Sequence, residues 1–124
     1  MPQWKYFTEK ELADTRTGEC HMDADFMVKL IKLRELYGKP MRITSGYRSK
    51  ETNLAVNGAE NSPHMYGKAV DVYVSGVDAL NLLVLAVDVG FTGIGVSQKG
   101  TSRFIHIDTM ENSPTQPRPT IWSY

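Results

Sequence analysis

The sequence predicts an α+β domain, with helices early in the chain and a small, mainly antiparallel sheet late. Two segments with helical periodicity and end signals lie at about 23–38 and 77–90. Segments that alternate apolar and polar residues lie at 68–74 and 103–108, and a turn signal at Lys99-Gly100 favours a hairpin. Helices and strands grouped in this way are typical of the α+β class.

Length and composition predict one domain spanning 1–124, because the chain has 124 residues. Its 14 basic and 14 acidic side chains balance, so charge gives no reason to expect nucleic acid or an anionic membrane. No apolar run approaches the roughly 18 residues of a membrane span, and the first residues lack the apolar core of a signal peptide. We therefore expect synthesis in the cytoplasm, without stable membrane insertion.

The first half of the chain carries end signals for two helices. Thr8 and Glu11 form a capping box that opens a short helix. Asp23 can cap a longer helix, which Gly38 and Pro40 end. The apolar stripe of that helix is expected to consist of Phe26, Met27, Leu30, Ile31, Leu33 and Leu36.

A short strand is expected from Met41 to Thr44, followed by a long polar stretch from Ser45 to Pro63. A stretch of that length without regular structure favours a functional loop, with a helical turn at Ser49 to Asn53. Cys20 is the only cysteine, which excludes an internal disulfide and a cysteine-rich zinc cluster. A lone cysteine is usually a small buried hydrophobe.

The second half carries the strand signals. In the segment Lys68 to Val74 the valines alternate with Asp71 and Tyr73, which therefore face the opposite side. Two further strands are expected at Gly93–Val96 and Arg103–Asp108. The helix over about 77–89 ends at Gly90, and its inward residues are expected to be Leu80, Leu83, Val84 and Val87.

The tail from Glu111 to Tyr124 carries three prolines, which predict irregular structure rather than a helix or a central strand. Its apolar end, Ile121-Trp122-Ser123-Tyr124, is expected to pack back on the domain.

Two histidines and an aspartate form a candidate metal site. Alternation places His106 and Asp71 on the face opposite the expected core, and facing residues of neighbouring antiparallel strands lie close together. His64, in the loop before the Asp71 strand, can supply a third ligand, and Gly67 lets that loop turn tightly. Three protein ligands with one open position are typical of catalytic zinc. Each histidine alone is more often a plain polar residue, and His21, which has no partner motif, is expected at the surface.

These residues resemble a known pattern. The segments His64-x-x-Gly67-x-Ala69-x-Asp71 and His106-x-Asp108 are similar to the metal-binding motifs of the M15 zinc peptidases. Ser45-Gly46-Tyr47-Arg48-Ser49, Gly90-Phe91-x-Gly93-Ile94-Gly95 and the final Trp122-Ser123-Tyr124 resemble segments of the small, single-domain members. The family includes D-alanyl-D-alanine carboxypeptidases and phage endolysins, and the resemblance implies a Hedgehog/D-Ala-D-Ala-peptidase-like fold.

The resemblance implies that Zn²⁺ is bound by His64, Asp71 and His106. It places Arg48 beside the metal, where a guanidinium can hydrogen-bond the scissile carbonyl or the oxyanion, although Arg48 could instead only order the loop. Ser62 could line the site or order the loop through its hydroxyl. Tyr47 and Trp122 could wall the cleft against a sugar or peptide, with core packing as the alternative for Trp122.

The proton-transfer residue departs from the family pattern. Many members carry a glutamate three positions before the last histidine ligand, where this chain has Arg103. Asp108 is one candidate for catalysis, but its preferred interpretation is a hydrogen-bond partner of a ligand imidazole. The remote alternatives, which the sequence does not rank, are His21, Glu51, Glu60 and Glu111.

The resulting hypothesis is a zinc metallopeptidase that hydrolyses peptide bonds in the stems or cross-links of peptidoglycan, as a carboxypeptidase or an endopeptidase. We expect a monomer that acts on the cell wall after release from the cytoplasm, in the manner of a phage or prophage lysis enzyme. The alternative is a zinc-containing domain that binds the cell wall without cutting it.

Overall fold

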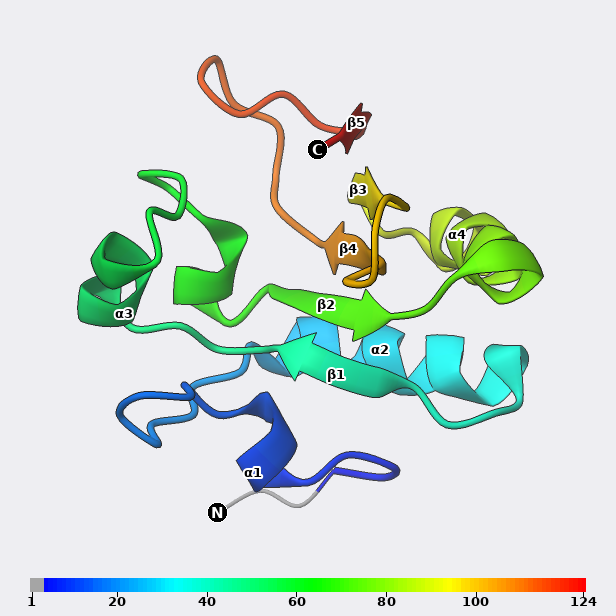
Figure 1. Cartoon of the computed structure of the whole chain (residues 1–124), viewed down its shortest axis with the longest axis horizontal. Helices are drawn as coiled ribbons and strands as arrows, with labels where there is room; N and C mark the ends of the chain where they lie inside the picture. The colour runs from blue at the N-terminus through cyan, green and yellow to red at the C-terminus, as the bar shows by residue number, and fades with distance from the viewer. Residues whose placement is uncertain (1–3) are drawn as a thin grey trace.

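The computed structural model describes residues 4–124, in which four α-helices, one 3₁₀ helix and five strands are assigned (Figure 1). The helices are α1 (Glu9–Leu12), α2 (Ala24–Tyr37), α3 (Lys50–Ala55), η1 (Pro63–Tyr66) and α4 (Gly76–Val89). The strands are β1 (Arg42–Ser45), β2 (Ala69–Tyr73), β3 (Gly93–Ser97), β4 (Phe104–Asp108) and β5 (Thr120–Ser123).

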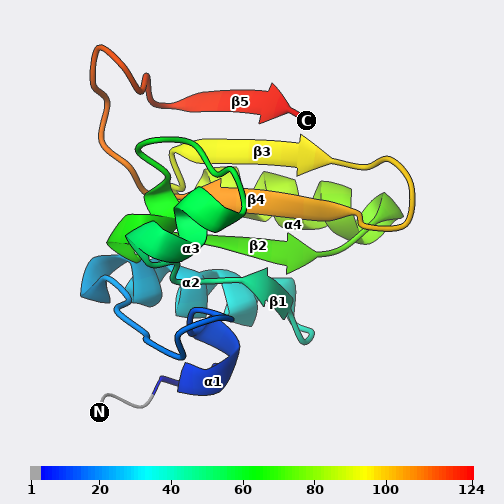
Figure 2. The same ribbon diagram turned by 60° about the vertical axis from the view of Figure 1, so that its left-hand side comes forward.

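The strands form one sheet in the order β1-β2-β4-β3-β5. Three neighbouring pairs are antiparallel and the pair β3–β5 is parallel, so the predicted α+β class with a mainly antiparallel sheet is confirmed. The long helices α2 and α4 lie on one face of the sheet, and α3 lies on the other (Figure 2). No helix among residues 4–124 is long and apolar enough to cross a membrane.

The core lies between the sheet and the two long helices. Strand alternation turns one face of β2 and β4 inward, and helix α2 begins at the predicted cap, where the Asp23 carboxylate accepts from the amide of Phe26. Leu36 is 51% exposed, so its assignment to the apolar stripe is wrong. The main buried residues are Phe26, Met27, Leu30, Leu33, Val70, Val72, Ala79, Leu82, Ala86, Ile105 and Ile107.

Helix α4 has a different inward face from the predicted one. Leu80, Val84 and Val87 are exposed, and Leu83 is only half-buried. The residues that face the core are Ala79, Leu82 and Ala86. Apolar residues occupy nearly every side of this helix, so its periodicity does not specify which side is buried.

The tail also differs in part from the prediction. Residues 111–119 are largely irregular, as expected, but β5 is a strand that pairs parallel with β3, with Ile94 opposite Ile121 and Gly95 opposite Trp122. Pro119 immediately precedes β5, and a proline there costs no hydrogen bond within the strand. The expected return of the apolar end to the domain is confirmed by this pairing.

A buried carboxylate holds the loop that leads into α3. Asp14 is 3% exposed, and it accepts hydrogen bonds from the amides of Arg16 (2.7 Å), Thr17 (3.0 Å) and Ser49 (2.7 Å) and from the Thr52 hydroxyl (2.9 Å). Burial alone would raise the pKa of Asp14, but these hydrogen bonds outweigh it and hold the pKa well below its usual range. The ionised carboxylate therefore ties the N-terminal segment to the residue that follows Arg48.

We expect Asp14→Ala to lower the free energy of unfolding by about 2–4 kcal/mol at pH 7, because it leaves several buried donors without an acceptor. The folded-state pKa lies below the unfolded value of about 3.9, so this stabilisation is complete above about pH 5 and diminishes as the pH falls below about 4. Urea unfolding at pH 7, 5 and 3 measures it. Asp88→Ala, at an exposed position, serves as the control. A difference between wild type and Asp14→Ala that does not shrink in acid would contradict this account.

Candidate metal centre

Two neighbouring strands and one 3₁₀ turn bring the three predicted ligands together. Asp71 on β2 lies directly opposite His106 on β4, on the face away from the core. His64 comes from η1, which Gly67 ends in the left-handed region at φ 66°. A Cβ on Gly67 would overlap the backbone of His21, so this glycine serves a close chain crossing beside the site.

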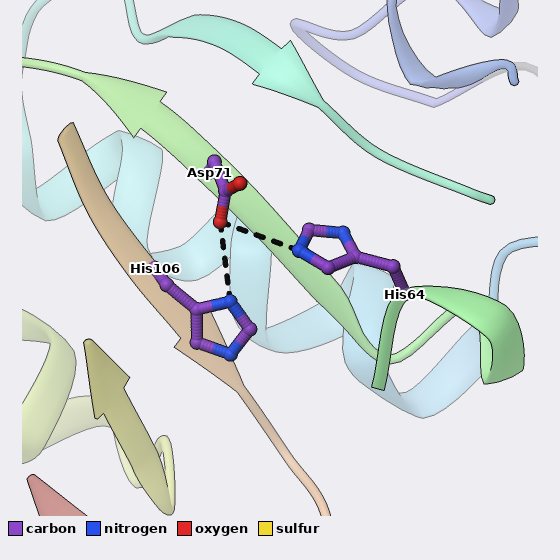
Figure 3. A group of neighbouring side chains, drawn as sticks. All are labelled: His64, Asp71 and His106. Atoms are coloured by element: carbon purple, nitrogen blue, oxygen red, sulfur yellow. Dashed lines mark hydrogen bonds and ion pairs between the residues drawn. The ribbon is translucent and has the colours of Figure 1, made fainter. Parts of the chain in front are cut away.

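The three side chains point toward one another, with Asp71 in the middle (Figure 3). Its Oδ1 lies 3.3 Å from His64 Nε2 and 3.1 Å from His106 Nδ1. One ligand atom of each residue lies within 4.8 Å of the others. A tetrahedral zinc ion with bonds of about 2.0–2.1 Å spaces its ligand atoms by about 3.3–3.4 Å, and the two distances from Asp71 Oδ1 to the histidine nitrogens are close to this spacing.

The remaining ring nitrogens fix which nitrogen faces the site. His64 Nδ1 lies 2.8 Å from the carbonyl oxygen of Gly46, which can only accept, so Nδ1 carries the proton and Nε2 offers its lone pair. His106 Nε2 lies 2.7 Å from Asp108 Oδ2, which leaves Nδ1 turned to Asp71. Both imidazoles are thus oriented as ligands by partners behind them.

Charge at the centre is set by burial and by these contacts. Burial alone would raise the pKa of Asp71, but the neighbouring His106 and His64 imidazoles outweigh it and keep that pKa well below its usual range. Burial alone would lower the pKa of His106, but Asp108 and Asp71 outweigh it and raise that pKa. Protons compete with a metal for the ligand nitrogen of His106, so we expect metal affinity to weaken in acid.

Asp108 is fully buried and makes several hydrogen bonds. Its Oδ1 accepts from the Met110 amide (3.2 Å) and from Arg118 Nε (3.0 Å), and its Oδ2 faces Arg118 Nη2 at 2.9 Å as well as His106. It does not line the cleft described below. The structure therefore places Asp108 as the partner of a ligand imidazole and leaves it no free route to a substrate, which argues against the catalytic alternative.

A cleft of about 480 Å³ opens over the three ligands. Arg48 lines it and donates from Nη1 to Asn53 Oδ1 (3.0 Å) and from Nη2 to Ser45 Oγ (3.3 Å). Because both partners are uncharged, the positive charge of Arg48 is not neutralised by them.

Ser62 also lines the cleft, and its hydroxyl accepts from the His64 amide at 3.3 Å, so it orders η1 as well. Trp122 forms part of the wall, with its ring centre 5.1 Å from that of His106. Trp122 is not part of the hydrophobic core, so the alternative that it only packs in the core is wrong.

Tyr47 lies outside the cleft, which corrects its predicted place in the wall. Its ring packs edge-on against His21, with ring centres 5.0 Å apart, and it is not among the residues that line the cleft. The remote candidates for proton transfer are all exposed and outside the cleft lining: His21, Glu51, Glu60 and Glu111. Among residues 4–124, Asp71 is the one carboxylate that lines the cleft.

Sequence reasoning missed Arg118 and the space made by two glycines. A Cβ on Gly93 would overlap the Asp108 carboxylate, and one on Gly95 would lie 2.7 Å from Trp122 Nε1. The sequence signal was available, because glycines two positions apart in a strand lie on the same face. They indicate that other groups approach that face closely. Nothing in the sequence near Arg118 indicated its partner.

Comparison with known proteins gives consistent matches. The family model described as Peptidase M15 matches residues 5–108. The peptidoglycan L,D-endopeptidase MepK of Escherichia coli K12 is 33% identical over 95 residues, which are 71% of this chain and 51% of that protein.

Two further relatives extend the comparison. The probable peptidoglycan L,D-endopeptidase MepK of Haemophilus influenzae is 32% identical over 107 residues, covering 79% of this chain and 56% of that protein. The zinc D-Ala-D-Ala carboxypeptidase of Streptomyces albus G is 37% identical over 83 residues, covering 65% of this chain and 32% of that protein. The chain spans about half the length of the MepK relatives.

Proposed function

The chain belongs to the M15 family of peptidases, and from that membership we propose that it is a zinc-dependent peptidase that hydrolyses peptide bonds of bacterial peptidoglycan. The names of the relatives support the substrate class, since two are peptidoglycan endopeptidases and one is a zinc carboxypeptidase. We further propose the Hedgehog/D-Ala-D-Ala-peptidase-like arrangement for its fold.

The observation that carries this proposal is the ligand geometry. Nε2 of His64, Oδ1 of Asp71 and Nδ1 of His106 converge at spacings that suit tetrahedral zinc, on the floor of a cleft. The ring nitrogens behind them are held by a carbonyl and a carboxylate, as is typical of ligand histidines. Three protein ligands leave a fourth position for water or substrate, which a structural site would not need.

The mechanism assigns roles to this chain's own residues. Bound zinc would supply a Lewis acid and lower the pKa of a coordinated water to about 7. Arg48 faces the same cleft, where its guanidinium can donate hydrogen bonds to the carbonyl oxygen of the scissile bond as negative charge develops. Asn53 and Ser45 hold that guanidinium in place, and Trp122 bounds the cleft beside His106.

A second candidate function rests on the composition of the cleft. Hydrolysis requires a group that carries a proton to the leaving amine, and the described lining offers no carboxylate apart from Asp71. Arg103, at the position where many family members have a glutamate, is exposed and donates to the carbonyl of Gly100 at 3.0 Å. This observation favours a zinc-containing domain that binds cell-wall peptide without cutting it.

Metal analysis and muropeptide mass spectrometry separate the two functions. We expect about one zinc per chain after reconstitution, and new products when the loaded protein is incubated with purified peptidoglycan. Defined muropeptides then identify whether a D-Ala-D-Ala, an L,D or a cross-link bond is cut. Full zinc occupancy with unchanged muropeptide masses, together with co-sedimentation with peptidoglycan, would establish the binding domain instead. Failure to retain zinc would contradict both.

The cellular setting stays a prediction from the sequence. A role in phage or prophage lysis, action on the wall after release and a monomeric state are part of the proposal. Lysis assays and solution mass measurements address them.

A further inference from the structure

The C-terminal segment reaches the metal centre although it lies outside the residues that match the family. The match ends at residue 108, yet Arg118, Trp122 and Tyr124 line the same cleft as the three ligands. The position of β5 explains this, because it pairs with β3 at the edge of the sheet, and the segment that joins β4 to β5 loops around the end of the sheet where β4 ends (Figure 2).

Arg118 makes a two-point contact with a carboxylate behind the site. Its Nε and Nη2 donate to the two oxygens of Asp108 at 3.0 and 2.9 Å. The Arg118 side chain is 6% exposed, and its guanidinium lies 5.2 Å from the centre of the Trp122 ring. Its backbone amide donates to Asn112 Oδ1 at 2.9 Å, so the residue is anchored at both ends.

The two-point contact fixes the plane of the Asp108 carboxylate. Oδ2, one of the oxygens that Arg118 holds, is also the atom that lies 2.7 Å from His106 Nε2. The Met110 amide donates to Oδ1 at 3.2 Å and His106 lies at Oδ2, but the planar Arg118 guanidinium is the group that donates to both oxygens at once and so sets the plane of the carboxylate. A carboxylate with no solvent exposure also needs a partner charge.

The sheet provides the space for this arrangement. Gly93 pairs with Asp108 and Gly95 pairs with His106, and any larger residue at either position would enter the volume of Asp108 or Trp122. The contacts that join Arg118, Asp108 and His106 therefore depend on strands β3 and β4 and on the segment before β5.

We propose that Arg118 is a positioning residue for the metal centre, which acts through Asp108 to hold the His106 imidazole with Nδ1 turned toward the metal. This inference rests on the proposed function, because it requires a metal at His64, Asp71 and His106. It assigns residues beyond 108 to the centre.

The affinity for Zn²⁺ tests this role without reference to catalysis. Competition with a chromophoric chelator should show that Arg118→Gln binds Zn²⁺ about 10–100-fold more weakly than wild type. Arg42→Gln is the matched control, since Arg42 is exposed on β1 and packs against Tyr73. Equal affinity in wild type and folded Arg118→Gln would overturn the inference and leave the zinc site intact. Absence of zinc binding in wild type would overturn the proposed function, and the inference with it.

A double variant tests whether Arg118 acts through Asp108. We expect Asp108→Asn to weaken Zn²⁺ binding to a similar degree, and the combination with Arg118→Gln to weaken it no further. If the double variant instead lost Zn²⁺ affinity by the product of the two single losses, Arg118 would act independently of Asp108. That result would overturn the proposal that Arg118 acts through Asp108.

Nitrogen-15 NMR of the zinc-loaded protein reports the protonated nitrogen of His106. It should be Nε2 in wild type, and this preference should be lost or mixed in Arg118→Gln. If Arg118→Gln does not fold, Arg118→Lys replaces it, because lysine keeps the charge but cannot make the two-point contact. Full affinity and an unchanged tautomer in Arg118→Lys would contradict positioning by geometry.

Discussion

Replacing Asp71 by alanine is expected to abolish both zinc binding and peptide hydrolysis. The Asp71 carboxylate is the central ligand of the site, and it supplies the one negative charge among the three ligands. Its loss leaves two neutral imidazoles, which hold a divalent cation far more weakly. We expect the release of new amino termini from peptidoglycan to fall by about 10³-fold or more, because the Lewis acid that lowers the barrier by several kcal/mol is lost.

Elemental analysis and muropeptide mass spectrometry measure these two effects on one preparation. Asp78→Ala is the matched control, since Asp78 is a surface carboxylate of α4 paired with Lys39 at 2.6 Å. The variant should remain folded, because Asp71 faces the cleft and lies opposite the core side of its strand. Hydrolysis that persists in metal-free Asp71→Ala would refute the zinc mechanism.

Replacing Arg48 by glutamine is expected to lower kcat about 10²–10³-fold while zinc binding is retained. Arg48 lines the cleft beside the candidate ligands, and its guanidinium donates hydrogen bonds to Asn53 and Ser45. It can therefore be removed without taking a donor atom from the metal. The loss should appear in kcat more than in KM, because the interaction strengthens as charge develops on the carbonyl oxygen.

Steady-state kinetics on a defined muropeptide and zinc analysis of the same samples provide the measurement. Arg103→Gln, an exposed arginine just before β4, is the control and should behave as wild type. An unchanged kcat in zinc-loaded Arg48→Gln would mean that Arg48 only orders the loop between β1 and η1.

Local signals predicted most of the elements and the three candidate ligands that the structure brings together. The caps at Thr8 and Asp23 act within a few residues, so they are visible in the sequence without knowledge of the fold. The alternation in β2 and β4 is equally local, and it placed Asp71 and His106 on one face before their pairing was known. The histidine and aspartate chemistry then pointed to a metal.

The wrong predictions arose where the local sequence was compatible with more than one arrangement. Helix α4 is apolar on nearly all sides, so only packing selected Ala79, Leu82 and Ala86 as its inward face. Proline in the tail argued against a central strand, and the structure satisfies that constraint with an edge strand. The resemblance suggested Tyr47 as part of the cleft wall, but its ring packs against His21 and it is not among the residues that line the cleft.

The sequence by itself determined which residues are candidate metal ligands, because ligand chemistry belongs to side chains and alternation is a local property of a strand. Only the tertiary structure decided what surrounds them. Asp14 holds the loop that carries Arg48, and Arg118 holds Asp108 behind His106, through contacts between segments far apart in the chain. Such pairings depend on how the sheet and its loops pack in three dimensions, which spacing along one sequence does not specify.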